Sequence, residues 1–519
     1  MRDEGSKGNA LRQRGLTGTG MDILHFLATG FSVALTWENL FYCFLGVLIG
    51  TLIGVLPGLG PSATISLLLP STFRLSPTAA IIMLAGVYYG AMYGGSTTSI
   101  LVNIPGEAAS VVTCLDGYQM ARQGRAGPAL GIAAFGSFIA GTLSVVGLMV
   151  AAPPLAIFAL KFGPPEYFSL IFLAFSILIY LASGSILKAI MMAAAGVFTG
   201  TIGTDFITGD PRFNYGNLTL SDGIGLVPAV MGFFGIAEVL ENIEREAEKA
   251  DVLRTKIKSL FPTLQDWKKS LAPIFRGTFL GFFLGILPGG GSVIASFTSY
   301  ALEKKISKHP EAFGKGAIEG VAGPESANNS ATGGNFIPLM TLGVPANVVM
   351  ALILGALMIH GIRPGPMLLQ EQPHLFWGVV TSMYIGNGML LILNLPLIAL
   401  WVRILLIPYR VLFPLILLFC VIGVFSLNNN MWEIIIMLFF GIIGYLMRRF
   451  NYEPAPFIFA LVLGPMMENS LRQSLLMSEG SFAIFFTEPI SCVLFVGGLI
   501  LFFIPVFPWF KRRQLKEDL

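Results

Sequence analysis

Long apolar runs recur along this chain, separated by short polar segments. Each run is about as long as the ~20 residues that cross a hydrocarbon core of ~30 Å, and about a dozen such segments can be recognised. Examples are 129–152, 168–187, 377–400 and 489–508. The backbone finds no hydrogen-bonding water in lipid, and these runs are too long and too uniformly apolar for barrel strands. The pattern therefore predicts an all-α, polytopic membrane protein.

Two apolar runs end in the same kind of break. The chain reads GVLPGLG at 54–60 and GILPGGG at 285–291, and each break precedes a short apolar stretch, at 61–70 and 292–302. These stretches are too short to cross a bilayer alone. Broken backbone at membrane depth must be buried in protein or line a watery cavity. We therefore predict re-entrant hairpins with their tips at the glycines, and a loop at the membrane surface remains the alternative.

A second pair of interruptions follows in the same order. YGGSTTSILVNIPGE (93–107) aligns with GGNFIPLMTLGVPAN (333–347) at an offset of 240 residues, close to the offset of 231 between the first breaks. Paired breaks of this kind are typical of transporters built from internal repeats. The predicted organisation is a polar, disordered N-terminal tail at 1–20, a first transmembrane repeat at 21–240, a charged connector at 241–276, a second transmembrane repeat at 277–510 and a cytoplasmic basic tail at 511–519.

Basic residues predict opposite orientations for the two repeats. Between Arg14 and Arg122 the only lysine or arginine is Arg74, so the feet of the first hairpin are expected outside. The second hairpin is flanked on both sides by basic residues, namely Lys268, Lys269, Arg276, Lys304, Lys305 and Lys308. Its feet are therefore expected in the cytoplasm. Similar hairpins that enter from opposite faces indicate an inverted repeat with the substrate site near the midplane.

Composition supports the membrane interpretation and adds little else. The chain is 54% hydrophobic and 12% charged with a mean hydropathy of +0.76, whereas soluble domains carry about 25% charged residues. We expect the lipid bilayer, and no nucleic acid, as its environment. No apolar stretch with a cleavage site occurs near the start, so no secretory signal is predicted. The four cysteines lack CxxC spacing and are interpreted as small core residues, namely Cys43, Cys114, Cys420 and Cys492.

The residues around the breaks also indicate what kind of ligand could bind there. Glycines expose backbone N–H groups, a helix that restarts after a break points its positive end at the gap, and nearby hydroxyls and amides add neutral donors. This combination predicts an anion site without a fixed cation, although a single serine or threonine more often serves helix packing. The candidate substrate-binding residues are Gly58, Gly60, Ser62, Thr64, Gly94, Gly95, Ser96, Thr97, Asn103, Gly289, Gly290, Gly291, Ser292, Asn328 and Asn329.

Acidic residues inside a membrane are costly and usually functional. Glu325 lies in GPESANN and Glu107 in NIPGE, so either could take a proton or complete a cation site with Ser326 and Ser330. Glu107 could equally belong to an exposed turn. Free carbonyls of the broken segments could hold Na⁺ as the coupling ion.

Other activities find less support in the residues. No GxxxxGK[ST] occurs, and the GxGxxA at 58–63 lacks a βαβ context, so neither ATP nor a dinucleotide is expected. The histidines are scattered and form no HExxH, so no cofactor, metal or catalytic residue is predicted; they are His25, His309, His360 and His374. An intramembrane enzyme and an anion channel remain as alternatives to a secondary transporter.

Three long motifs resemble one family. GVLPGLGPSATISLLLP, YGGSTTSILVNIPGEAASVVTCLDGYQMARQGRAGPAL and GPESANNSATGGNFIPLMTLGVPANVVMALILGALMIHGIRPGP resemble the large membrane subunit of the tripartite tricarboxylate transporters, the TctA family. The resemblance covers nearly all of 21–510. It implies a bacterial inner-membrane symporter that imports di- or tricarboxylates such as citrate and uses Na⁺ or H⁺ instead of ATP. Its implied partners are a small membrane subunit (TctB-like) and a periplasmic solute-binding protein (TctC-like).

Overall fold

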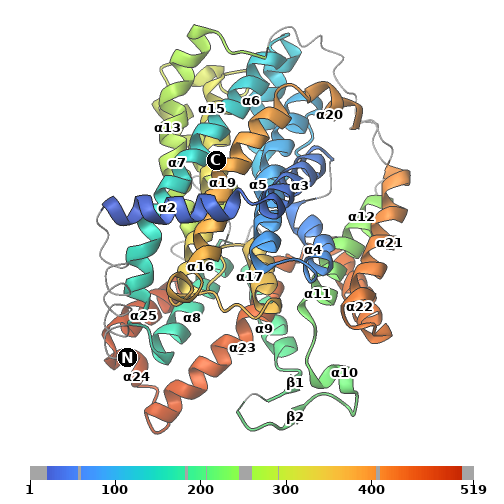
Figure 1. The fold of residues 1–519 in the computed structure, drawn as a ribbon, viewed down its shortest axis with the longest axis vertical. Coiled ribbons are helices and arrows are strands. Elements are labelled where there is room, and N and C mark those ends of the chain that lie inside the picture. Colours follow the sequence, from blue (N-terminus) through green and yellow to red (C-terminus); the bar gives the residue numbers. More distant parts are fainter. Residues whose placement is uncertain are drawn as a thin grey trace. The chain divides into compact units, whose positions relative to one another are not determined.

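The computed structural model is mostly helical, as predicted, and forms two compact units (Figure 1). Each unit combines segments from both halves of the chain. The predicted site residues Gly58 and Gly290 lie outside the described residues, as do both terminal tails except for Gly20. The described ranges are 20–56, 60–181, 185–205, 207–244, 260–289, 291–404 and 409–504.

The first unit contains the described residues of Met1–Ala159, Glu238–Leu287 and Gly291–Gly423. Its helices are α2 (Gly20–Ala34), α3 (Trp37–Val55), α4 (Pro61–Thr72), α5 (Pro77–Val102), η1 (Ala108–Ser110), α6 (Val111–Arg122), α7 (Ala126–Ala159), α13 (Leu264–Ile286), α14 (Gly291–Ile306), η3 (Pro310–Ala312), α15 (Glu319–Gly334), α16 (Phe336–Leu342), α17 (Val348–Ile359), α18 (Leu368–Glu371), α19 (Pro373–Asn394) and α20 (Ile398–Ile404). Helix α13 therefore begins inside the predicted connector.

The second unit contains the described residues of Leu160–Ala237, Pro288–Gly290 and Val424–Leu519. The boundaries between the units fall in α12 (Ala237–Glu244) and α21 (Tyr409–Asn428). Helix α8 packs against α25, and α9 packs against α23. The elements of this unit are α8 (Pro164–Tyr180), α9 (Ile186–Gly200), β1 (Gly203–Thr204), β2 (Pro211–Arg212), α10 (Leu218–Ser221), α11 (Leu226–Val230), the π-helical turn η2 (Met231–Ile236), α22 (Met431–Arg449), α23 (Pro454–Met477), α24 (Ile484–Thr487) and α25 (Pro489–Phe503). Strands β1 and β2 pair antiparallel.

Six helices in the described part of the chain are long and apolar enough to cross a membrane. Shorter apolar helices, such as α8, α9, α17 and α25, accompany them. The six candidate spans are Trp37–Val55, Pro77–Val102, Ala126–Ala159, Leu226–Glu244, Pro373–Asn394 and Met431–Arg449.

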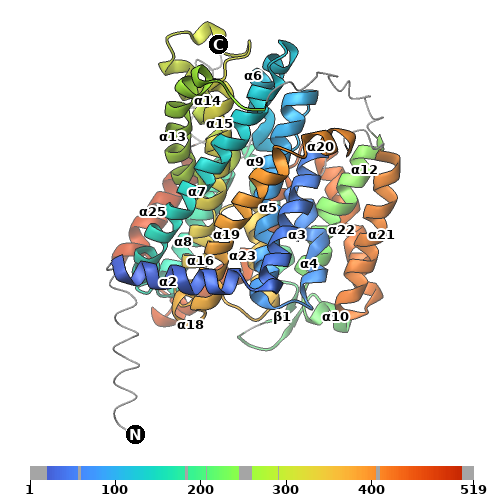
Figure 2. The same ribbon diagram turned by 45° about the horizontal axis from the view of Figure 1, so that its top comes forward.

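Glycines spaced four residues apart hold two helix pairs together in the first unit. A Cβ on Gly46, Gly50 or Gly54 of α3 would overlap carbonyl oxygens of α5, so only hydrogen fits between these backbones. The equivalent glycines of α13 meet α15 in the same way; they are Gly277, Gly281 and Gly285. In both pairs the contacts advance in the same direction along both helices. The members of each pair therefore run parallel, and Figure 2 shows them side by side.

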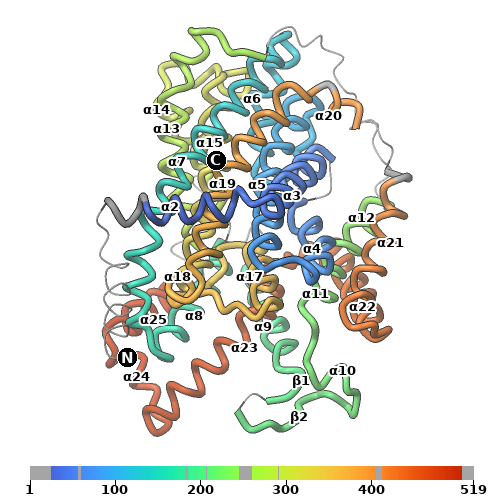
Figure 3. Tube along the Cα trace, in the orientation of Figure 1, coloured from blue at the N-terminus to red at the C-terminus, as the bar shows by residue number. Residues whose placement is uncertain are grey.

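In the sequence, a short helix lies between the two members of each pair. Figure 3 traces the chain from α3 through α4 to α5, and from α13 through α14 to α15. Helix α4 begins with Gly60 as its N-cap and Pro61 at its first position, which suits a restart directly after a break. Helices α4 and α14 have 12 and 16 residues, less than the ~20 needed to span a bilayer.

The two pairs run in opposite directions. Tyr88, in the first half of α5, bonds Asn335 just beyond the end of α15, whereas Ser96, further along α5, bonds Glu325 near the start of α15. Helices α5 and α15 are therefore antiparallel, so the α3–α5 and α13–α15 pairs run in opposite directions within this unit. These contacts support the predicted inverted repeat, whose placement in a bilayer stays a prediction.

The ends of the pairs also match. Helix α5 ends at Asn103 and α16 ends at Gly343, both in the left-handed region (φ 61° and 72°) and 240 residues apart. Four residues after each of these positions, a residue caps the next helix: Glu107 caps η1 and Asn347 caps α17. The side chain of Glu107 accepts a hydrogen bond from Ala109 N, and that of Asn347 accepts one from Met350 N. The predicted correspondence of 93–107 with 333–347 thus extends to local backbone structure.

Candidate functional site

The predicted Glu325 lies where α15 crosses α5 and α6. Its side chain is 1% exposed. Ser96 donates to Oε2 at 2.5 Å, and Thr113 of α6 donates a short hydrogen bond to Oε1. No lysine or arginine of the described chain pairs with this carboxylate. Glu325 is therefore a buried acid held by hydroxyl groups, in a structure where an uncompensated charge would be costly.

Glu107 is also buried, at 8% exposure, which argues against the exposed turn. Asn328 Nδ2 of α15 donates to Oε1 at 3.2 Å, and Ala109 N donates to Oε2 at 2.6 Å. Ser110 closes the turn, because its hydroxyl accepts from Glu107 N at 3.3 Å. Gly106 permits this close approach, since its Cα packs against Gly54 and Gly95. This second acid likewise forms no ion pair with a described residue.

A cluster of neutral polar groups surrounds Tyr88 of α5. Its buried hydroxyl accepts from Asn335 Nδ2 at 2.7 Å and from Asn347 Nδ2 at 2.9 Å. Ser292, the second residue of α14, lies 3.4 Å from the same hydroxyl oxygen. Ser292 was predicted from the sequence, whereas Tyr88, Asn335 and Asn347 were not. Asn335 and Asn347 lie within the motif at 333–347. Amides in such apolar surroundings could have indicated a polar site.

Several predicted residues cluster around these groups. Ser96 and Asn328 contact the two acids as described, and Asn329 Nδ2 donates to Ser137 of α7 at 2.7 Å. Gly95 lies against the side chain of Glu107, and a Cβ on Gly291 would lie 2.8 Å from Asn335 Oδ1. The crossing of α5 and α15 thus brings residues of both repeat motifs together.

Other predicted residues have structural contacts or lie apart. Thr64 donates to Gly60 O in its own helix, and Ser330 donates to Thr278 O of α13. Asn103 is an exposed helix end. Gly289 (φ 113°) belongs to the second unit, where it lies against Leu178. The remaining predicted residues are Ser62 at the partly exposed start of α4, Gly94 in the contact with α3, the buried Thr97, and Ser326, whose buried hydroxyl has no partner among the described residues.

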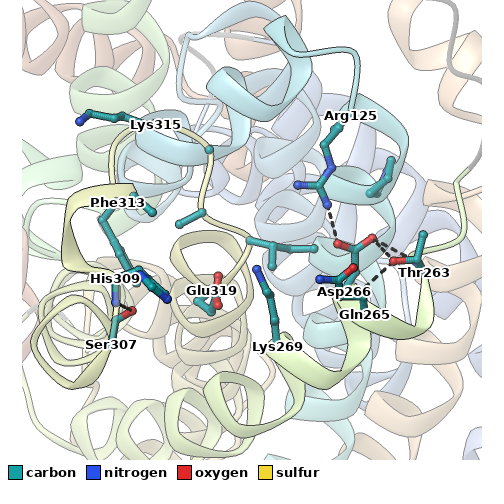
Figure 4. Close-up of a pocket in the computed structure, with 15 residues that line it drawn as sticks. Arg125, Thr263, Gln265, Asp266, Lys269, Ser307, His309, Phe313, Lys315 and Glu319 are labelled. Atoms are coloured by element: carbon teal, nitrogen blue, oxygen red, sulfur yellow. Dashed lines mark hydrogen bonds and ion pairs between the residues drawn. The ribbon is translucent and has the colours of Figure 1, made fainter.

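The basic residues counted in the sequence meet at one end of the first unit. A pocket of about 580 Å³ opens there, and Figure 4 shows Arg125 paired with Asp266 on one wall and Lys269 reaching between Asp266 and Glu319. Arg276 pairs with Glu303 nearby at 2.5 Å. This gathering of charge marks the end that the positive-inside rule assigns to the cytoplasm.

Asp116 of α6 shapes this end, and the sequence analysis missed it. The fully buried carboxylate accepts from the N–H groups of Gly314, Gly316 and Ala317 at 2.7–2.9 Å, and from Tyr300 at 3.0 Å. It thereby fixes the loop that leads into α15. Its partners lie about 200 residues away along the chain, so no local pattern could have indicated this role.

The second unit holds a separate charged cluster beside β1 and β2. Asp205 Oδ2 pairs with Arg472 at 2.7 Å and with Arg212 at 3.6 Å, and both arginines also contact Glu468. The N–H groups of Thr208 and Ile207, together with Arg472, hold the pKa of Asp205 well below its usual range. Asp205 is therefore a loop residue whose charge is compensated.

Comparisons with known proteins agree with the sequence motifs. Residues 40–459 match the tripartite tricarboxylate transporter TctA family. An uncharacterized 52.8 kDa protein in the TAR-I ttuC′ 3′ region of Agrobacterium vitis is 52% identical over 496 residues, which cover 96% of this chain and 99% of that protein. An uncharacterized protein in the TAR-II ttuC′ 3′ region of the same organism is 52% identical over 234 residues, which cover 45% of this chain and 97% of that protein. No solved structure matches the chain.

The family match spans most of the chain and includes every predicted site residue. It confirms a multi-pass membrane subunit of a bacterial transporter and excludes the intramembrane enzyme. The chain belongs to the tripartite tricarboxylate transporter TctA family.

Proposed function

We propose that this chain forms the transport path of a secondary transporter that imports di- or tricarboxylates, such as citrate, across the bacterial inner membrane. A TctC-like periplasmic binding protein delivers the anion, and a TctB-like small membrane subunit completes the complex. The gradient of Na⁺ or H⁺ drives uptake. The family supports the substrate class and the partners, and the buried acids of the first unit support the coupling.

The observation that carries the coupling is the pair Glu325 and Glu107. Both side chains are buried, Glu325 within α15 and Glu107 just after the end of α5, and their hydrogen-bond partners are hydroxyls, an amide and a backbone N–H group. An ionised carboxylate in such surroundings is stable only with a compensating charge. A proton or a cation must therefore accompany these groups, and its release on one side of the membrane can be coupled to transport.

Neutral donors support carboxylate binding in the same region. Two amide N–H groups, from Asn335 and Asn347, converge on the Tyr88 hydroxyl beside the first turn of α14. Helix α14 has 16 residues, and the positive end of its dipole favours an anion. In this proposal the substrate carboxylates settle at the tips around 58–62 and 289–292, and the coupling cation offsets their charge. A movement of one repeat relative to the other then exposes the site inward.

The test is uptake of labelled citrate, and then of smaller carboxylates, into cells that express all three proteins, with and without a sodium or proton gradient. We expect saturable uptake that requires all three proteins and collapses with the gradient. Uptake that persists without any gradient, or that does not saturate, would favour a channel. No uptake of any carboxylate, while the purified binding protein binds another class of ligand, would refute the substrate assignment.

A variant of Glu325 tests whether this residue takes part in gradient-driven uptake. Glu325→Gln keeps the shape and one accepting oxygen but removes the charge, so gradient-driven uptake should fall at least about tenfold, the equivalent of 1.4 kcal/mol. Glu166→Gln is the matched control, because Glu166 is a buried acid that caps α8 in the second unit. Equal losses in both variants, at equal amounts of folded protein, would remove Glu325 from the coupling mechanism.

A further inference from the structure

A small cavity lies among α5, α7, α15 and α19 of the first unit. Its volume is about 30 Å³. Since about 10–15 Å³ of this measure holds one water molecule, the space suits one or two waters or a single small ion with a water. The lining polar side chains are Tyr89, Tyr93, Ser144, Asn329, Thr332 and Asn387.

The two amides have already used their N–H groups elsewhere. Asn387 Nδ2 donates to Phe138 O at 2.8 Å and to Thr142 Oγ1 at 3.0 Å, and its Oδ1 accepts from Tyr93. Asn329 Nδ2 donates to Ser137 Oγ at 2.7 Å and to Glu325 O at 3.0 Å. Both amide oxygens therefore retain lone pairs, while neither amide retains a free donor of its own.

Most of the hydroxyl groups have likewise donated their hydrogens to other protein atoms and keep free lone pairs. Ser144 donates to Gly141 O at 3.1 Å, Thr332 donates to Asn328 O at 3.0 Å, and Tyr93 donates to Asn387 Oδ1 at 2.5 Å. Tyr89 differs, because its buried hydroxyl lies beside Cys43 and Ser382 and has no well-formed hydrogen bond to a described residue. Gly386 leaves room for this hydroxyl, since a Cβ there would overlap it. The lining thus offers up to six side-chain oxygens and very few hydrogens.

From this accounting we infer that the cavity is a Na⁺ site. A hard cation is satisfied by oxygen lone pairs alone, whereas a water molecule also needs donors for its own lone pairs. The nearest acid along α15 is Glu325, which lies one helical turn before Asn329 and whose backbone carbonyl accepts a hydrogen bond from that residue. This inference rests on the proposed function, for which it names the coupling ion and locates it between α5, α15 and their neighbours α7 and α19.

Thermal unfolding of the purified chain in detergent, without carboxylate, tests the inference directly. Tm is measured in NaCl, KCl and choline chloride at equal ionic strength. We expect Na⁺ to raise Tm in a saturable manner and K⁺ to raise it less, because a ligand that binds only the folded state stabilises it. A Na⁺ response no larger than that in choline chloride would overturn the inference.

Tyr89→Phe is the informative variant. It removes a buried hydroxyl without a well-formed hydrogen bond, so its Tm in choline chloride should equal or exceed that of the unmodified chain. Loss of one ligand should raise the half-saturating Na⁺ concentration about tenfold. Thr332→Val is a second variant with the same expectation for Na⁺. Tyr384→Phe is the matched control, because Tyr384 lies in α19 but its hydroxyl contacts Met149 Sδ instead of the cavity.

The outcomes separate this inference from the proposed function. Full Na⁺ responses in Tyr89→Phe and Thr332→Val would place the ion elsewhere, even if citrate uptake remained sodium-driven. Na⁺ responses lost in both variants and kept in Tyr384→Phe would establish the site, even if no carboxylate were transported.

Discussion

The helix pairs α3–α5 and α13–α15 share a backbone arrangement and differ in chemistry. Gly94 lies against Thr51 O and Gly54, and Gly334 lies against Phe282 O and Gly285; these contacts are equivalent at offsets of 240 and 231 residues. The polar side chains do not repeat in this way. Position 85 is alanine, whereas its equivalent is Glu325. Close backbone packing therefore requires the glycines, while the polar side chains differ between the two pairs.

One pair of hydrogen bonds joins equivalent positions of the two predicted repeats. Asn347 donates to the Tyr88 hydroxyl, and at the equivalent positions Asn328 donates to the carboxylate of Glu107. The roles of the equivalent residues are exchanged, because both acceptors, Tyr88 and Glu107, lie in the first half of the chain and both donors lie in the second.

The largest expected effect comes from disrupting the glycine contacts that both helix pairs share. Gly50→Ala and Gly281→Ala each force a methyl group into the carbonyl oxygen of the facing helix. Overpacking of this kind costs about 3 kcal/mol, so both variants should lower Tm and the yield of folded protein in detergent to a similar degree. Gly388→Ala is the control, because a Cβ at that helical glycine meets nothing within 4 Å. If only one of the two variants kept a normal Tm and yield, the two helix pairs would not be packed in an equivalent way.

Removing the charge of Glu107 should have the next largest effect. Glu107→Gln makes this acceptor neutral, while a side-chain oxygen remains for Asn328. We expect folded protein whose citrate uptake falls about tenfold and depends less on the driving gradient. Uptake assays at several sodium concentrations and pH values provide the measurement. Unchanged gradient dependence would leave Glu325 as the sole acid of the coupling mechanism.

Much of this fold could be predicted from periodicity, because apolar runs long enough to span lipid have few structures open to them. The LPG breaks and the GG-to-proline spacing indicated the repeat, since glycine and proline act through local backbone geometry. The glycine contacts between α3 and α5 were not predicted, although Gly46, Gly50 and Gly54 carry a regular spacing that suggests a packed helix face.

The candidate site was harder to predict for a physical reason. Glu325 and Glu107 were identified because an acid in an apolar sequence is costly and therefore conspicuous. Tyr88 and Asp116 gave no comparable signal: tyrosine is common in membrane helices, and Asp116 looks like an ordinary charge in a polar stretch. Their importance arises from amides and backbone N–H groups about 200 residues away or more, and such partners are fixed only by tertiary packing.

A smaller effect is expected at the neutral acceptor Tyr88. Tyr88→Phe leaves the N–H groups of Asn335 and Asn347 without their acceptor, at a cost of about 2 kcal/mol in the free energy of unfolding. Tm should fall, and the Km for citrate should rise more than the maximal rate declines, because these amides belong to the proposed substrate site. Tyr384→Phe again serves as the control. A lower Tm with unchanged Km would limit Tyr88 to a structural role.

The smallest effect is expected for an acid whose charge is already compensated. The pKa of Asp205 is lowered by N–H groups of its own loop and by Arg472, so ionised Asp205 stabilises the fold above about pH 4, near the ordinary pKa of aspartate. This stabilisation is lost as pH falls and the carboxylate becomes protonated. Asp205→Asn should therefore lower Tm slightly at pH 7, and the difference should narrow below about pH 4. Uptake of citrate should not change, because both arginines keep Glu468 and the loop lies in the second unit. A strong loss of uptake at normal Tm would instead assign a transport role to this cluster, and would show that the functional asymmetry is not confined to the two helix pairs.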